Sequence, residues 1–111
     1  MKVAVIGSRN LKVDLSKYIP EGTTAIVSGG AKGIDTCAAE YANQNGIELI
    51  EFLPQYKKYG RGAPLKRNDQ IIDEADVVLA FWDGKSKGTK YGIDRCRKIG
   101  KEVKVYMQED K

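Results

Sequence analysis

Short apolar segments alternate with segments of helical periodicity along this chain, and that alternation constrains the fold more than any other feature. Residues 3–6 are continuously apolar, as expected for a strand that is covered on both faces. Apolar residues at 34, 37, 38, 41 and 42 follow the spacing of an amphipathic helix, which Asn45 and Gly46 end. By the same criteria we expect further strands at residues 24–27, 47–53, 76–82 and 103–107, and further helices at residues 11–19, 65–75 and 89–99.

The expected order is a strand followed by a helix, repeated four times and closed by a fifth strand. Such alternation requires crossover connections, which produce a parallel sheet with helices on both faces. The sequence therefore predicts an α/β fold: a single Rossmann-like, three-layer domain with a five-stranded, mostly parallel sheet. In the last strand, Val103, Val105 and Met107 alternate with Lys104 and Tyr106, which indicates a half-buried edge strand. The 111 residues have the length of one domain, and we expect residues 108–111 to be a frayed tail.

The absence of histidine removes several classes of function. Without imidazole the chain has no Ser-His or Cys-His catalytic pair and no His-ligated metal site. Cys37 and Cys96 fall on apolar helix positions, so we expect them in the core and not in a disulfide or a metal cluster. The longest apolar run, residues 77–82, is far shorter than a membrane span, and the N-terminus lacks the pattern of a signal peptide. We therefore expect a cytoplasmic protein that uses no metal or other cofactor.

Loops that carry glycine follow three of the expected strands. In an open parallel sheet, ligands bind beyond the carboxyl ends of the strands, where the strand order reverses. Glycine lets the backbone approach an anion, and the next helix presents unpaired N–H groups to phosphate oxygens. Each glycine could instead be a simple turn residue, but three such loops at one edge favour a phosphate or nucleotide site. The loops match neither the P-loop nor the dinucleotide-binding glycine pattern. The candidate ligand-binding residues in them are Gly7, Ser8, Arg9, Ser28, Gly29, Gly30, Lys32, Gly33, Asp35, Trp82, Gly88 and Thr89.

Several candidate side chains have an alternative role in the fold itself. Arg9 could hold a phosphate group bidentately or be a solvated arginine. Asp35 could belong to the site or simply complement the positive end of its own helix. Trp82 and Tyr56 could stack on a nucleobase, although an aromatic residue at the end of an apolar strand also serves packing.

The charge of the chain is unevenly distributed. Basic residues outnumber acidic ones 19 to 15, and the net charge of +4 favours an anionic partner. After Pro54 we expect an irregular, basic stretch that ends near Ala63. The residues Lys57, Lys58, Arg61, Lys66 and Arg67 have no acidic residue among them, so this region is either a phosphate-contacting flap or a solvated loop.

Four segments of the chain resemble the SLOG superfamily of Rossmann-like domains. They are Gly7-Ser8-Arg9, Ser28-Gly29-Gly30-Ala31-Lys32-Gly33-Ile34-Asp35, Arg67-Asn68 and Gly88-Thr89. That superfamily includes the DprA (Smf) proteins and the LOG-type phosphoribohydrolases, and the branch most similar to this chain is that of small bacterial and phage proteins related to YspA and YpsA. The resemblance covers nearly the whole chain and adds Arg67 and Asn68 to the candidate residues. It implies a nucleotide or nucleotide-derived ligand held by the strand-end loops.

The resemblance implies three functions, between which the sequence leaves a choice. The first is binding of a nucleotide-derived small molecule, as a sensor or regulatory module. The second is a nucleoside-monophosphate phosphoribohydrolase; the LOG-type enzymes use a glutamate where this chain has Gly92, so Asp35, Asp83 or Asp94 would have to replace it. The third is binding of single-stranded DNA, as in DprA, through the basic stretch. We favour binding over catalysis because of Gly92. A homodimer is compatible with the expected helices, although no apolar stripe on them requires one.

Overall fold

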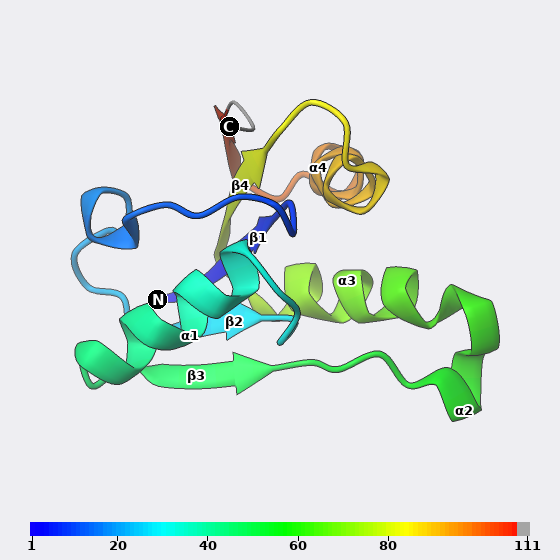
Figure 1. The fold of residues 1–111 in the computed structure, drawn as a ribbon, viewed down its shortest axis with the longest axis horizontal. Coiled ribbons are helices and arrows are strands. Elements are labelled where there is room, and N and C mark those ends of the chain that lie inside the picture. Colours follow the sequence, from blue (N-terminus) through cyan, green and yellow to red (C-terminus); the bar gives the residue numbers. More distant parts are fainter. Residues whose placement is uncertain (109–111) are drawn as a thin grey trace.

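The core of the fold is a five-stranded sheet in the order β3-β2-β1-β4-β5, in which every neighbouring pair is parallel (Figure 1). The computed structural model describes residues 1–108. The predicted α/β fold is confirmed, and the sheet is wholly parallel. Its strands are β1 (Lys2–Gly7), β2 (Ala25–Ser28), β3 (Glu48–Glu51), β4 (Val77–Trp82) and β5 (Val103–Met107).

Helices cover both faces of the sheet because its central strands are apolar on both sides. In β1, Val3 and Val5 face one core cluster, whereas Ala4 and Ile6 face the other. The first cluster is covered by α1 (Ile34–Gln44) and the short 3₁₀ helix η1 (Leu15–Lys17), and the second by α3 (Ala63–Glu74) and α4 (Lys87–Ile99). In Figure 1, α1 and η1 lie to the left of β1 and β4, and α3 and α4 lie to the right. The three predicted layers are present.

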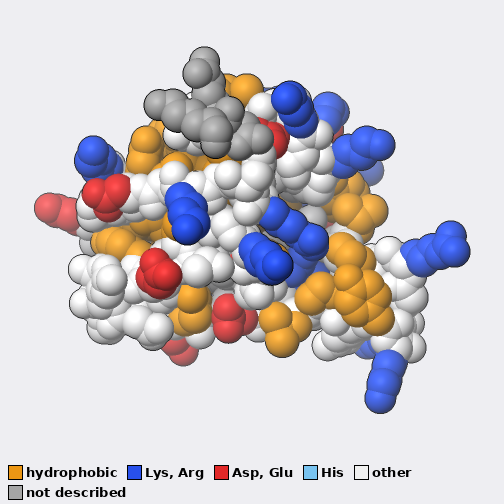
Figure 2. Space-filling view, viewed as in Figure 1, with side chains coloured by type: hydrophobic (Ala, Val, Ile, Leu, Met, Phe, Trp, Pro, Cys, Tyr) orange, Lys and Arg blue, Asp and Glu red, His pale blue; other side chains and the backbone are white. Residues whose placement is uncertain are grey.

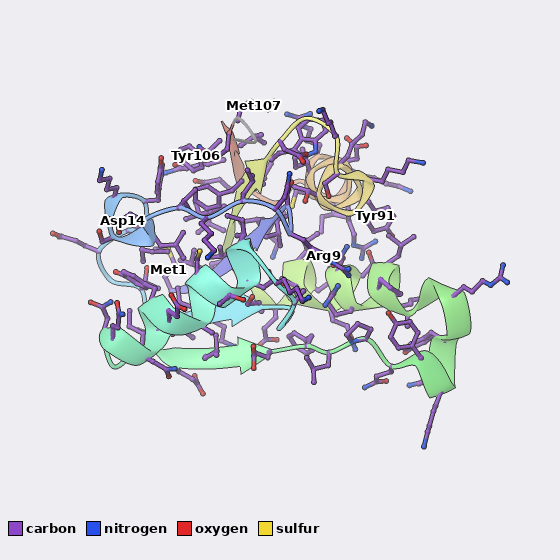
Figure 3. The ribbon with its side chains drawn as sticks, viewed as in Figure 1. Met1, Arg9, Asp14, Tyr91, Tyr106 and Met107 are labelled. Atoms are coloured by element: carbon purple, nitrogen blue, oxygen red, sulfur yellow. The ribbon has the colours of Figure 1, made fainter. Side chains whose placement is uncertain are left out.

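An aromatic cluster changes the expected pattern of the last strand. The ring of Tyr106 lies 4.7 Å from that of Tyr18 and 5.2 Å from that of Phe81, measured between centroids. Met107, which the alternation placed on the inner face, is 62% exposed at the end of the strand (Figure 3). Val103 and Val105 pack against the second core cluster, as the alternation predicted. The prediction failed at Met107, which ends the edge strand, and at Tyr106, whose ring packs with two other aromatic rings in the first cluster.

Two connections differ from their predictions. Residues 11–19 form only the single turn η1, because Asp14 caps it by accepting hydrogen bonds from the N–H and hydroxyl of Ser16, and Pro20 follows soon after. The predicted irregular stretch after Pro54 instead contains one helical turn, α2 (Tyr56–Tyr59), and a 3₁₀ turn, η2 (Gly60–Gly62). These turns run directly into α3, which therefore begins at Ala63 and not at residue 65; Pro64 suits its first turn.

The ends of the described chain are tied to the sheet. Gln108, predicted to belong to a frayed tail, donates its backbone N–H to the carbonyl oxygen of Trp82 over 2.9 Å. The rest of that predicted tail, residues 109–111, lies outside the described residues. Among residues 1–108, no helix has the length and apolar character that crossing a membrane requires.

The order in which the strands are added to the sheet reverses between β1 and β4. The loop that follows β1 turns toward α1, and the loop that follows β4 leads to α4 on the opposite face. A crevice forms between two such loops, at the carboxyl edge of the sheet. Gly33, the residue before α1, packs so closely against the loop after β1 that an added Cβ would lie 2.3 Å from the carbonyl oxygen of Arg9. This contact fixes one wall of the crevice.

We expect Gly33→Ala to destabilise the fold by about 3 kcal/mol, because a backbone atom blocks the new methyl group and the backbone is left-handed there. The φ angle of Gly33 is 70°. The measurement is the midpoint of urea unfolding followed by circular dichroism. Gly62→Ala is the matched control: a Cβ there meets nothing within 4 Å and φ is −80°, so the midpoint should stay the same or rise slightly. Equal midpoints for the two variants would contradict this account.

Candidate ligand-binding site

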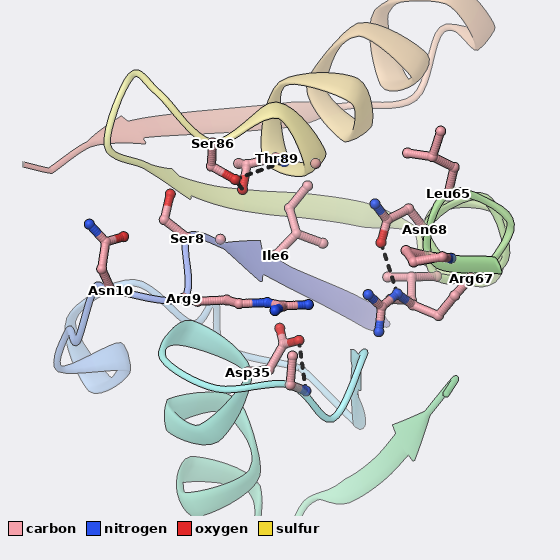
Figure 4. Close-up of a pocket in the computed structure, with 15 residues that line it drawn as sticks. Ile6, Ser8, Arg9, Asn10, Asp35, Leu65, Arg67, Asn68, Ser86 and Thr89 are labelled. Carbon is pink, nitrogen blue, oxygen red and sulfur yellow. Dashed lines mark hydrogen bonds between the residues drawn. The ribbon is translucent and has the colours of Figure 1, made fainter. Parts of the chain in front are cut away.

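A cavity of about 380 Å³ occupies the crevice at the carboxyl edge of the sheet, within the size range of small-ligand sites. Residues from four elements line it: the loop after β1, the start of α1, the first half of α3 and the start of α4 (Figure 4). Eight of the candidate residues lie in this lining, namely Gly7, Ser8, Arg9, Asp35, Arg67, Asn68, Gly88 and Thr89. The structure thus brings together three loops that the sequence places far apart.

Arg67 supplies a buried positive charge to the wall of the cavity. Its side chain is only 7% exposed, and Nη1 donates a hydrogen bond to the carbonyl oxygen of Gly29 over 2.8 Å. Its Nε donates to the Oδ1 of Asn68 over 2.9 Å. Burial lowers the pKa of the Arg67 guanidinium; Asp35 opposes that change and the charge of Arg9 adds to it. The guanidinium retains hydrogen-bonding N–H groups beyond these two.

Asp35 is the one carboxylate in the lining of this cavity among the described residues. Its Oδ2 accepts a hydrogen bond from the backbone N–H of Ala31 over 3.1 Å, which closes the loop before α1. Burial raises the pKa of Asp35 above its ordinary value, whereas the Ala31 N–H, Arg67 and the hydroxyl of Ser28 act in the opposite direction. Asp35 is thus a residue of the first turn of α1 whose side chain also lines the cavity.

Arg9 brings a second guanidinium to the same space. Its side chain extends from the loop after β1 across the cavity, toward Asp35 and Arg67 (Figure 4). In the view of the whole molecule, Arg9 lies between the loop that leads into α1 and the helix α3 (Figure 3). Two guanidinium groups thus line the cavity together with one carboxylate, whose ionised form is disfavoured by burial. The cavity has an excess of positive charge, which suits an anionic ligand.

The N-terminus of α4 forms the opposite wall. Ser86 caps this helix: its Oγ lies 3.4 Å from the backbone nitrogen of Thr89 and 3.1 Å from the hydroxyl of Thr89. A Cβ on Gly88 would meet nothing nearer than the Asn68 amide, at 3.9 Å, so the backbone is accessible there. Unpaired N–H groups and the helix dipole make such a terminus favourable for phosphate.

The loop before α4 is held in shape by Asp83. Its Oδ1 accepts hydrogen bonds from the backbone N–H groups of Lys85 and Ser86, over 2.8 and 2.9 Å, and these bonds lower the pKa of the Asp83 carboxyl. The hydroxyl of Ser8, which is buried, accepts a bond from the N–H of Asp83 over 3.3 Å. Ser8 therefore joins the loop after β1 to the loop after β4.

The remaining candidate residues lie outside this cavity. Trp82 packs against the second core cluster and donates its Nε1–H to the carbonyl oxygen of Ser86 over 3.0 Å. Ser28 is fully buried, Gly29 supplies the carbonyl that Arg67 contacts, and Gly30 lies beside Leu53. Lys32 and Gly33 line a second cavity, of about 780 Å³, between the loop after β1 and the start of α1.

Other residues of the cavity were not among the candidates. Leu65 and Pro64 line it because α3 begins earlier than the sequence predicts and turns its first residues toward the site. Ser86 could have been found, since a serine three residues before Thr89 is a typical helix cap. The other additions are Ile6, Asn10, Ala31 and Ile71.

Gly92 lies beneath the floor of the cavity. It is buried in α4, and a Cβ there would lie 2.8 Å from the Cδ1 of Ile6, which lines the floor. Of the three carboxylates considered as replacements for a glutamate, Asp35 lines the cavity, Asp83 holds its own loop, and Asp94 is bonded to Lys90 on the exposed side of α4. Within residues 1–108, no three Cys, Asp or Glu side chains are grouped closely enough to hold a metal ion.

This sheet order and the cavity at its reversal point define a Rossmann-like domain. Residues 1–59 match the family described as "YspA, cpYpsA-related SLOG family", and the chain belongs to that family.

Two further comparisons extend beyond the matched segment. Over 81 aligned residues the chain is 33% identical to the Gene 61 protein of Mycobacterium phage D29. The alignment covers 68% of this chain and 65% of the phage protein. The crystal structure of DNA processing protein A (DprA) from Streptococcus pneumoniae superimposes with a TM-score of 0.76 at 25% sequence identity, covering 94% of this chain and 49% of the DprA chain. The chain thus spans about two thirds of the phage relative and half of DprA.

Asp35→Asn should change how stability depends on pH. The raised pKa means that, above the ordinary value of 3.8, the folded state binds more protons than the unfolded state. Wild-type stability is therefore lost as pH rises through the raised pKa, and the variant lacks this loss. We expect the difference in unfolding free energy to move in favour of the variant as the pH rises above about 4, and to become constant above the raised pKa. Urea unfolding at a series of pH values measures it, and a difference that stays constant or moves in favour of the wild type would refute it.

Proposed function

We propose that this domain binds a nucleotide or a nucleotide-derived small molecule in the cavity between β1 and β4, as a sensor or regulatory module. The observation that carries the proposal is the pair of guanidinium groups, Arg67 in the wall and Arg9 across the opening, over a single carboxylate. The accessible backbone at the start of α4 supplies hydrogen-bond donors opposite them. Membership of the SLOG family and the similarity to DprA are consistent with nucleotide or DNA binding in general.

Binding without turnover is the form of this proposal that the cavity supports best. The LOG-type enzymes that the sequence resembles use a glutamate where this chain has Gly92. Here that position is packed against Ile6, and Asp35 alone offers a carboxylate from the lining. Asp35 is already engaged by the Ala31 N–H.

Arg9→Ala should weaken binding of AMP, ADP or ADP-ribose by about tenfold or more, because it removes charge-assisted hydrogen bonds to phosphate. Isothermal titration calorimetry gives the affinities, with adenosine as the phosphate-free ligand. Arg97→Ala is the matched control, since Arg97 is exposed in the last turn of α4, away from the cavity. Absence of binding to the whole set of nucleotides, or equal affinities for both variants, would overturn the proposal.

A second candidate function is binding of single-stranded DNA, and the charge of the α2–η2 region favours it. Lys57, Lys58 and Arg61 are exposed on these turns, and residues 52–68 contain no acidic residue. None of these three side chains forms an ion pair with a carboxylate that the structure describes. Figure 2 shows Lys and Arg side chains that project from the end of the molecule where α2 lies. The structural neighbour is itself described as a DNA processing protein.

The triple variant Lys57→Ala, Lys58→Ala, Arg61→Ala tests this second function by fluorescence anisotropy with a thymidine oligonucleotide of about 15 residues. If the region contacts phosphates, affinity falls and the plot of log affinity against log salt becomes less steep by about 2. A control triple, Arg97→Ala, Lys98→Ala, Lys104→Ala, removes the same charge elsewhere on the surface. Equal losses in the two triples would indicate a non-specific effect of net charge and would count against the proposal.

A further inference from the structure

One side of the cavity carries an exposed apolar surface that the core does not use. Six large apolar side chains are exposed among residues 1–108, and three of them come from the segment between the end of β3 and the first turn of α3: Leu53 and Tyr56, each 60% exposed, and Leu65, 42% exposed. Scattered single exposures are ordinary, but a group beside a cavity marks a binding surface. We call Leu53, Tyr56 and Leu65 the apolar rim.

Each residue of the apolar rim is placed against a different part of the site. Leu65 lines the cavity itself. The side chain of Leu53 lies over the loop after β2, where its Cδ2 is 2.7 Å from the position that a Cβ on Gly30 would take. Tyr56 begins α2, which packs against α3, the helix that carries Leu65 and Arg67. In Figure 2, apolar side chains lie directly beside the Lys and Arg side chains around the central hollow.

The two tyrosines of α2 differ in what covers their rings. Tyr59 has the ammonium groups of Lys58 and Lys66 over its ring, at 5.2 and 5.9 Å from the centroid. No described aromatic or cationic group stacks on the ring of Tyr56. Trp82, the other aromatic candidate, is held by Ser86 and packed against the core. Of these aromatic residues, Tyr56 therefore has the exposed and uncovered ring, on a turn that packs against the helix lining the cavity.

We propose that Tyr56 and Leu65 bind the base of a nucleotide whose phosphate lies between Arg9 and Arg67. This inference rests on the proposed function. It adds which residues bind the base, the part of the ligand that the two arginines do not contact. A ligand that fits both surfaces is flat and apolar at one end and anionic at the other. A nucleotide has that character, whereas a sugar phosphate or inorganic phosphate has no group for the apolar rim. Base-on-aromatic stacking tolerates any base, so the rim selects for the presence of a base and not for its identity.

The test compares AMP with ribose 5-phosphate, which carries the same sugar and phosphate without the base. In the wild type we expect AMP to bind about tenfold more tightly or better, the range that stacking of one base provides. Tyr56→Ala should bring the two affinities together by weakening AMP, with little change for ribose 5-phosphate. Tyr56→Phe keeps the ring and should retain the preference. Tyr59→Ala is the matched control, because it removes a ring from the same helical turn that is already covered by lysines. Thermal unfolding by circular dichroism confirms that each variant is folded.

The outcomes separate this inference from the proposed function. If both ligands bind the wild type equally, or if Tyr56→Ala keeps the preference for AMP, the base does not contact the apolar rim and only this inference fails. If neither ligand binds, this inference fails, and the proposed function fails with it when ADP and ADP-ribose do not bind either. The apolar rim could instead contact a second copy of the chain. Sedimentation velocity tests this by measuring whether the protein forms a dimer. A dimer that Tyr56→Ala dissociates, with the preference for AMP unchanged, would assign the rim to self-association and overturn the inference.

Discussion

The hydrogen bond from Arg67 to the carbonyl oxygen of Gly29 is the interaction on which the arrangement of the site depends. It joins α3 to the loop after β2 across the carboxyl edge of the sheet, with a guanidinium that is 7% exposed. A buried charge is stable only where hydrogen bonds compensate for lost water. The Gly29 carbonyl and the Asn68 amide supply two such bonds, and an added Cβ on Gly29 would lie 2.5 Å from Nη1. Glycine at this position therefore makes the burial of the charge possible.

Short hydrogen bonds also hold the other walls of the cavity in place. Ser8 connects the loop after β1 to Asp83, and Asp83 shapes the turn that allows Ser86 to cap α4. Asp35 closes the loop before α1 by accepting the N–H of Ala31. Each of these residues satisfies backbone groups of the scaffold and leaves the guanidinium groups and the start of α4 facing the cavity. The site is thus preorganised by bonds that do not need a ligand to form.

The fold was largely predictable because it depends on patterns that are local in the sequence. Continuous apolar residues in β1 and β4 indicate strands covered on both faces, and the rule for parallel sheets then places their terminal loops together, as found for Gly7, Arg9, Gly88 and Thr89. What could not be predicted depends on contacts between distant segments. Tyr106, predicted on the exposed face of its strand, packs in the first core cluster because Tyr18 and Phe81 complete an aromatic cluster there, and Met107 is exposed because it ends the edge strand. The position of Trp82 depends on a bond to the Ser86 carbonyl, and that of Lys32 depends on the direction in which its loop turns. No periodicity encodes either of these.

The α2 and η2 turns contribute no buried residue to either core cluster. Figure 1 shows them at the outer end of α3, beyond the layers that stabilise the sheet. Because burial in the core supplies most of the folding free energy, the sequence between Pro54 and Ala63 can change with little cost to folding. The cavity wall built by β1, α1 and α4 would remain. Replacement of this short segment by others would therefore be a practical way to give one stable scaffold different ligand preferences.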